Sequence, residues 1–167
     1  VRIKDEPQFE YRGLHLDVGR HFFPVSFIKK YIDLLALHKM NKFHWHLTED
    51  QGWRLEIQKY PRLTEMGSVR PCTLVGHEKA RPRRYDDTPY GGYYTQQDVR
   101  RLVDYAATRG VRIVPEIDMP GHMQAAVSAY PELGNTDVTL QPRCHWGVSQ
   151  HILNPEESTV NFMEGVL

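Results

Sequence analysis

Strand-like and helix-like segments alternate along this chain, and that order constrains its fold more than any other feature of the sequence. The strand-like segments are 14–18, 42–48 and 111–118. The helix-like segments are 26–39, the stretch between Thr95 and Gly110, 121–130 and 155–167. Strands separated by helices form βαβ units, and the strands of such units are parallel because each helix carries the chain back across the sheet. The sequence therefore predicts an α/β fold built on a parallel sheet.

The second helix-like segment, between Thr95 and Gly110, has the clearest end signals. Thr95 followed three residues later by Asp98 resembles a capping box in which Asp replaces the usual Glu. Gly110 stands where a glycine commonly follows a helix. These signals predict a helix between the two ends.

The composition fits one globular domain. Of the 167 residues, 40% are hydrophobic and 25% are charged, as is usual for a folded domain. The 21 Lys and Arg balance the 21 Asp and Glu without a long basic run, so we expect no nucleic-acid partner. No apolar run approaches the roughly 18 residues of a membrane span. Cys72 and Cys144 lie far apart and form either one disulfide or none.

A long segment, residues 54–94, separates the second strand from the next helix and is rich in Gly and Pro. Loops of this length in compact domains usually have a function, for example as a lid. A surface decoration without a function is equally consistent with the pattern.

Polar and charged residues collect where each predicted strand ends. They are Asp17 and Arg20, Glu49 and Asp50, and Glu116, Asp118 and His122. The carboxyl ends of parallel strands meet at one edge of the sheet, where α/β proteins bind ligands. We therefore expect a functional site at this edge.

The first two groups each have more than one interpretation. Arg20 can offer a planar fork of donors to hydroxyls or a carboxylate, or it can form an ion pair with Asp17. Glu49 and Asp50 are adjacent, so their side chains point in opposite directions on an extended chain. We expect only one of these two carboxylates to face the site.

The third group has the same ambiguity. His122 either pairs with an acid and orients another catalytic group, or it caps the helix that follows it. Glu116 and Asp118 are two residues apart, which places them on one face at roughly 6.5–7 Å along a strand. That separation suits a pair of glycosidase carboxylates, but one of the two could equally be a structural hydrogen-bonding group.

His44 and His46 are also two residues apart and project to one face of the second strand. Such a pair can hold a divalent metal when a third ligand is available. Metal-dependent amidohydrolase barrels use a pair of this kind, although on their first strand.

Three long motifs occur in order along the chain. They are residues 11–22 (YRGLHLDVGRHF), 41–54 (NKFHWHLTEDQGWR) and 115–122 (PEIDMPGH). Together they closely resemble glycoside hydrolase family 20, the β-N-acetylhexosaminidases. The resemblance covers the chain from about Pro7 to Pro155.

The resemblance implies a (β/α)8 TIM barrel with its site at the C-terminal face. Residues 10–167 would be the N-terminal part of that barrel, with about three βα units, and residues 1–9 the end of a linker from a preceding small domain. A barrel of this kind takes roughly 250 residues, so we expect these 167 residues to belong to a longer chain.

The resemblance also implies roles for four residues. Arg20 matches the arginine that binds the C3 and C4 hydroxyls of the terminal sugar. Glu49 matches an acidic position, often Asp, that pairs with the histidine matched by His122, and this pair orients and tunes the catalytic acid. Asp118 matches an acidic residue that lines the same pocket.

The implied reaction removes a terminal non-reducing N-acetylglucosamine or N-acetylgalactosamine with retention of configuration. It is substrate-assisted, because the 2-acetamido oxygen of the sugar attacks C1. In the family, an Asp at the end of the fourth strand orients the acetamido group and the adjacent Glu is the general acid and then the base. The sequence to Leu167 contains no match to this pair, so we expect the isolated chain to be inactive and poorly folded.

Two other functions stay open from the sequence. One is a metal-dependent barrel hydrolase that uses His44 and His46, and the other is a non-catalytic sugar-binding relative. The resemblance implies no cofactor and no metal, and an N-acetylhexosamine-terminated oligosaccharide or glycoconjugate as the partner. It also implies a secreted or periplasmic location.

Overall fold

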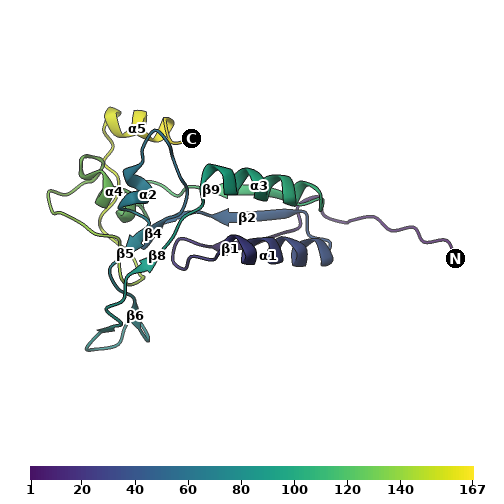
Figure 1. Cartoon of the computed structure of the whole chain (residues 1–167), viewed down its shortest axis with the longest axis horizontal. Helices are drawn as coiled ribbons and strands as arrows, with labels where there is room; N and C mark the ends of the chain where they lie inside the picture. The colour runs from purple at the N-terminus through teal and green to yellow at the C-terminus, as the bar shows by residue number, and fades with distance from the viewer.

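A three-stranded parallel sheet forms the centre of the molecule. The structure, a computed structural model, describes all residues from 1 to 167. Strands β1 (Gly13–Asp17), β2 (Lys42–His46) and β9 (Arg112–Glu116) lie in the order β1-β2-β9, and both neighbouring pairs are parallel. The predicted α/β arrangement with a parallel sheet is therefore confirmed (Figure 1). Strands β1 and β9 do not pair with each other, so the sheet is open.

Two helices, α1 (Val25–Leu37) and α3 (Gln96–Ala107), cover one face of this sheet. Ile32 of α1 and Leu102 of α3 are fully buried and pack in the same apolar cluster as Trp45 of β2. Burying a large apolar side chain contributes about 1.5–3 kcal/mol. This cluster therefore holds the two helices on the strands.

The ends of α3 follow the sequence signals. The Thr95 hydroxyl accepts a hydrogen bond from the N–H of Asp98, and the Asp98 carboxylate accepts one from the N–H of Thr95, so the predicted capping box is confirmed. Beyond the helix, Gly110 has a φ of 67°, a conformation that costs glycine little.

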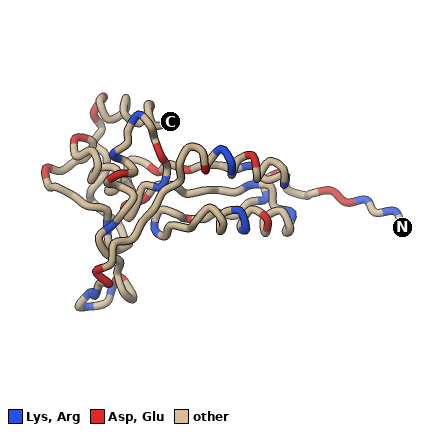
Figure 2. The backbone as a smooth tube through the Cα atoms, in the orientation of Figure 1, with Lys and Arg blue, Asp and Glu red and all other residues tan.

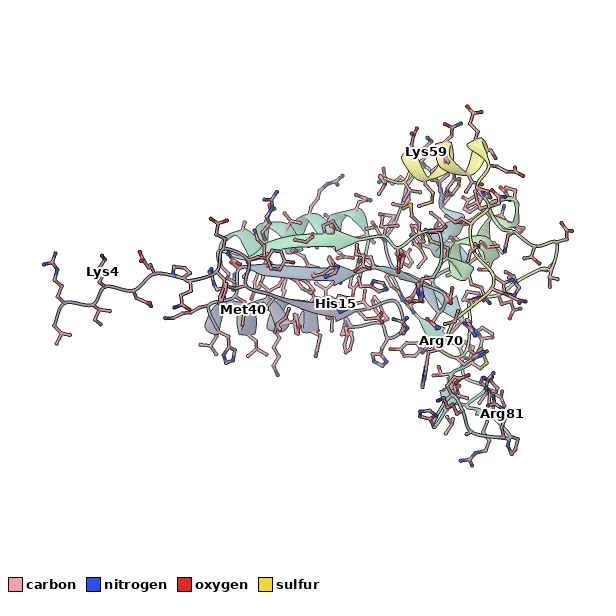
Figure 3. All side chains as sticks on the ribbon, turned by 180° about the vertical axis from the view of Figure 1, so that it is seen from behind. Lys4, His15, Met40, Lys59, Arg70 and Arg81 are labelled. Atoms are coloured by element: carbon pink, nitrogen blue, oxygen red, sulfur yellow. A yellow bond between two sulfur atoms is a disulfide. The ribbon has the colours of Figure 1, made fainter.

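The other face of the sheet carries polar side chains. His15 of β1 lies next to His44 of β2. Two residues further along the strands, Asp17 of β1, His46 of β2 and Glu116 of β9 lie side by side. Side chains at the same register share a face, so these five groups form one polar surface. Figure 3 shows His15 along the sheet and Arg70 beyond its strand ends.

Most of the remaining chain gathers beyond the carboxyl ends of the strands (Figure 1). It contains a second apolar core, with Trp53, Leu63 and Met123 among its buried members. The helical elements there are α2 (Arg62–Glu65), α4 (Gln124–Ala129), the 3-10 helix η1 (Pro131–Leu133) and α5 (Glu157–Glu164).

The long segment between β2 and α3 is built from short antiparallel pairs. These are β3 (Thr48–Glu49) with β4 (Gly52–Trp53), β5 (Val69–Arg70) with β8 (Tyr90–Gly91), and β6 (Leu74–Val75) with β7 (Arg84–Tyr85).

Cys72, in the segment between β2 and α3, and Cys144 form a disulfide, which settles the alternative that the sequence left open. The bond ties this segment to the loop that follows η1.

The strand predicted over 14–18 ends one residue early, at Asp17, and the other two predicted strands each end two residues early. The strand predicted over 42–48 stops at His46, because Thr48 and Glu49 turn away to pair with β4. The strand predicted over 111–118 stops at Glu116, so Asp118 lies in the loop beyond it. The helix predicted over 121–130 begins only at Gln124.

Charged residues of both signs are distributed along the chain (Figure 2), in keeping with the formal net charge of zero. None of the helices has the length and apolar character needed to cross a membrane.

Candidate functional site

The carboxyl ends of the three sheet strands bring the predicted site residues together. Asp17, His46 and Glu116 are the last residues of β1, β2 and β9, and they lie in register across the sheet. The chain beyond each strand end then adds Arg20, Glu49 and His122 to the same edge.

Glu49 is the buried centre of this group. Its side chain is 1% exposed, and its Oε1 lies 2.5 Å from Arg20 Nη2 and 2.7 Å from His122 Nδ1. Its Oε2 accepts a hydrogen bond of 2.7 Å from the N–H of Asp50. A Cβ on Gly19 would lie 2.6 Å from the Glu49 Cβ. Glycine at this position therefore allows the loop after β1 to lie close to Glu49.

The surroundings of Glu49 keep it ionised. Burial by itself raises the pKa of the carboxyl. The neighbouring His46, the N–H of Asp50 and the charge of Arg20 outweigh burial, so the pKa of Glu49 lies below its usual value. The site therefore holds a buried negative charge at neutral pH.

Arg20 combines both interpretations offered by the sequence. It forms the predicted ion pair with Asp17, at 2.6 Å, and it also contacts Glu49. Its side chain is still 40% exposed, so part of the guanidinium remains accessible to a ligand. The two carboxylates fix the plane of the guanidinium, which favours directional binding.

His122 does not cap a helix. Helix α4 begins after Met123, and no side chain caps it. His122 instead has a φ of 59° and places its Nδ1 against Glu49. The helix-capping alternative is therefore wrong, and the pairing with an acid is the arrangement observed.

Asp50 has different partners from Glu49. It accepts a hydrogen bond of 3.1 Å from the N–H of Gln124, and its Oδ2 lies 3.5 Å from Arg143. These contacts anchor α4 and the loop that follows η1. Of the two adjacent carboxylates, Glu49 is thus the one that faces Arg20.

Glu116 and Asp118 do not form a pair of carboxylates that is freely open to a substrate. It contacts His44, and its Oε1 lies 2.8 Å from His46 Nδ1. The N–H of Asp118 donates to the Thr48 hydroxyl at 3.1 Å, which fixes the loop after β9. These contacts favour a supporting role for Glu116.

Three groups of side chains have donor atoms close enough together to hold a metal ion. They are His15 with His44 and Glu116, His46 with Glu116 and Asp118, and Glu49 with Asp50 and His122. In the histidine groups, His44 and His46 both use the Glu116 carboxylate as their partner. Glu116 is therefore the common partner of the two histidines of the His-x-His pattern.

Arg54 is a structural residue of the site that the sequence does not reveal. It is 0% exposed, and its guanidinium donates to the carbonyls of Val18, Gly19, Ser68 and Gly92. Burial lowers the pKa of Arg54 to about 10, so it stays charged at neutral pH. Its place in the second motif, after Trp53, is the signal that could have drawn attention to it.

The arrangement can bind and orient a neutral polar ligand and can tune a nearby acid. The family comparison agrees with that chemistry. A sequence model described as "Glycosyl hydrolase family 20, catalytic domain" matches residues 9–167, and the chain belongs to that family.

Two curated relatives align with the whole chain. It is 49% identical over 168 residues to the "Beta-hexosaminidase" of Porphyromonas gingivalis, covering 100% of this chain and 20% of the relative. It is 43% identical over 171 residues to the "Beta-hexosaminidase" of Vibrio furnissii, covering 100% of this chain and 27% of the relative.

Solved structures show the same likeness. A crystal structure of a beta-N-acetylhexosaminidase superposes with a TM-score of 0.88 at 38% identity, covering 97% of this chain and 33% of that one. The beta-N-acetylhexosaminidase of Bacteroides fragilis superposes with a TM-score of 0.73 at 43% identity, covering 94% of this chain and 28% of that one. The chain therefore spans between a fifth and a third of the length of these relatives.

Proposed function

We propose that the protein to which this chain belongs is a retaining β-N-acetylhexosaminidase. Its substrate is a terminal non-reducing N-acetylglucosamine or N-acetylgalactosamine on an oligosaccharide or glycoconjugate. The observation that carries the proposal is the buried Glu49 carboxylate, held between Arg20 and His122 at the carboxyl ends of β1, β2 and β9. Membership of the family and the names of the relatives support it.

In this proposal β1, β2 and β9 are the first three strands of a (β/α)8 barrel. Both outer strands of the open sheet can accept further strands, which supports closure by chain outside these residues. Residues 1–9 are the end of a linker from a small preceding domain, and residues 10–167 are the N-terminal part of the barrel.

The residues of this chain bind the sugar and prepare the acid. Arg20 donates hydrogen bonds to the C3 and C4 hydroxyls of the terminal sugar. Glu49 fixes His122, and this pair orients and tunes the general acid. Asp118 lines the pocket from the loop after β9.

The bond-breaking step also needs the family's Asp–Glu pair, supplied by chain outside these 167 residues. The 2-acetamido oxygen of the sugar attacks C1 while the Glu carboxyl protonates the leaving oxygen, and the Asp orients the acetamido group. Water then opens the cyclic intermediate with the same Glu as the base, which gives retention at C1.

An assay of the full-length protein tests this proposal. We expect it to release the chromophore from aryl N-acetyl-β-glucosaminides or N-acetyl-β-galactosaminides with retention, as followed by NMR of the first-formed sugar anomer. The matched aryl β-glucoside, which lacks the acetamido group, should not be cleaved. Sugar binding without turnover would favour the non-catalytic relative, and inversion of configuration would exclude the mechanism.

Replacement of Arg20 by alanine tests its contact with the sugar. We expect kcat/KM of the full-length protein to fall about 100-fold, mainly through a higher KM. The variant loses two hydrogen bonds from a charged donor, each of which contributes about 1.5–3 kcal/mol, and water replaces part of that contribution. Arg112→Ala, at the amino end of β9 and exposed, is the matched control and should leave kcat/KM unchanged. An unchanged kcat/KM in Arg20→Ala would refute the role.

A further inference from the structure

His46 lies between two carboxylates below the proposed sugar-binding edge. It is 6% exposed, so its surroundings are protein and not bulk water. Its Nδ1 lies 2.8 Å from Glu116 Oε1, and its Nε2 lies 3.8 Å from Glu49 Oε1. The imidazole therefore lies within ion-pair distance of the last residue of β9 and of the buried centre of the site. Its Nε2 is buried and has no hydrogen-bond partner, so its interaction with Glu49 is one of charge.

The charges around His46 favour its cationic form. Asp17 on β1 and Glu116 on β9 lie in register with it, Asp118 reaches it from the loop beyond β9, and Glu49 reaches it from β3. The basic groups near it are His15, with a ring centroid 5.6 Å away, and His44, which shares the Glu116 carboxylate. Arg20 and His122 contact the same Glu49 Oε1 that His46 Nε2 faces. Carboxylates thus dominate the surroundings of the imidazole.

The balance of these effects makes His46 a cation at neutral pH. Burial lowers the pKa of an imidazole, but the contacts with Glu49 and Glu116 and the charge of Asp17 raise the pKa of His46 to about 9. A cation here has a direct consequence for Glu49. It supplies a counter-charge that the carboxylate would otherwise receive only from Arg20 and His122.

We propose that His46 is a positioning residue of the sugar-cleaving site, which as an imidazolium links Glu116 to Glu49 and holds the Glu49 carboxylate ionised and directed at His122. This role rests on the proposed glycosidase function, because its target is the pair that tunes the general acid. In this role His46, which is 6% exposed, acts through its carboxylate neighbours Glu49 and Glu116.

His44 provides a natural comparison on the same strand. It contacts the same Glu116 carboxylate as His46, but its side chain is 37% exposed and no contact joins it to Glu49. A role limited to supporting Glu116 would make the two histidines equivalent. A role transmitted to Glu49 makes only His46 important for the reaction.

The pH dependence of kcat and kcat/KM in the full-length protein tests this role, with an aryl N-acetyl-β-glucosaminide as substrate. We expect His46→Gln to lower kcat about 10- to 100-fold, as a small misplacement of a catalytic group does, with KM within about threefold of wild type. The acid limb of the profile should move to higher pH, because Glu49 loses a cation and its pKa rises.

Two further variants separate this role from a packing effect. Glu116→Gln should move the alkaline limb to lower pH, because the imidazolium loses an anionic partner and deprotonates earlier. His44→Gln should leave both limbs in place. Thermal unfolding at neutral pH checks that each variant is folded, and Glu116→Gln carries the test if His46→Gln does not fold.

The outcomes are distinct. If the wild type turns over substrate, the role of His46 alone would be overturned by a His46→Gln variant whose kcat stays within threefold of wild type and whose pH limbs do not move. If His46→Gln is unfolded, unmoved pH limbs in Glu116→Gln would have the same meaning. Equal shifts in His44→Gln and His46→Gln would also overturn it. No turnover by the wild type would refute the proposed function, and this inference with it.

Discussion

Replacing Glu49 by glutamine in the full-length protein is expected to lower kcat/KM about 1,000-fold. The amide keeps the shape of the side chain but removes the charge that Arg20, His46 and His122 share. General acid–base catalysis contributes about 100- to 10,000-fold, and in the proposed mechanism His122 needs the Glu49 carboxylate to orient and tune the acid. Steady-state kinetics across pH measure the loss.

The same substitution should also lower the free energy of unfolding. Glu49 is 2% exposed, but Arg20 keeps its ion pair with Asp17 and His46 keeps its contact with Glu116. The side chains of Arg20 and His122 are also 40% and 41% exposed, so water compensates part of the lost charge. We therefore expect a decrease of about 1–3 kcal/mol. Urea denaturation measures this effect separately from activity. Glu49→Asp is the control, since it keeps the charge and should retain activity within about tenfold. Activity of Glu49→Gln within tenfold of wild type would contradict the proposed role.

Replacing Arg54 by methionine is expected to have the largest effect on stability. Met fills a similar volume but donates no hydrogen bond, so the carbonyls of Val18, Gly19, Ser68 and Gly92 lose a charged donor together. Each buried carbonyl left without a partner costs about 1–3 kcal/mol. Allowing for partial relaxation and water entry, we expect the free energy of unfolding to fall by about 4 kcal/mol.

The Arg54 variant should also release the segment between β2 and α3. The guanidinium joins the loop after β1 to the carbonyls of Ser68, just before β5, and Gly92, just after β8, so limited proteolysis should cut within residues 68–92. Arg54→Lys should recover little stability, because a single ammonium cannot reach the same spread of carbonyls. Arg100→Met, on the exposed face of α3, is the control. A loss below 1 kcal/mol in Arg54→Met would contradict this account.

Local rules sufficed to predict the parts of the fold whose causes lie within a few residues. The capping box of Thr95 and Asp98 and the alternation of strands and helices are of this kind. The strand ends were missed because β2 is stopped by a tertiary event, the pairing of Thr48 and Glu49 with β4. Sequence periodicity contains no information about such a partner.

The candidate site shows the same division. The ion pair of Arg20 with Asp17 spans three residues and was among the sequence interpretations. The contact of His46 with Glu116 depends on the register of β2 against β9, which a single sequence does not specify. The carbonyl contacts of Arg54 depend on where three loops converge, and no spacing rule describes them.

The backbone of His122 has a consequence for how this molecule can be altered. Its φ of 59° lies in the left-handed region, which costs an ordinary residue about 1 kcal/mol or more relative to glycine. A glycine at this position would relax the backbone while removing the imidazole that faces Glu49. The gain in backbone freedom would therefore be offset by the loss of a partner of the buried Glu49 carboxylate. At this position an unfavourable backbone conformation is retained together with a contact that the site needs.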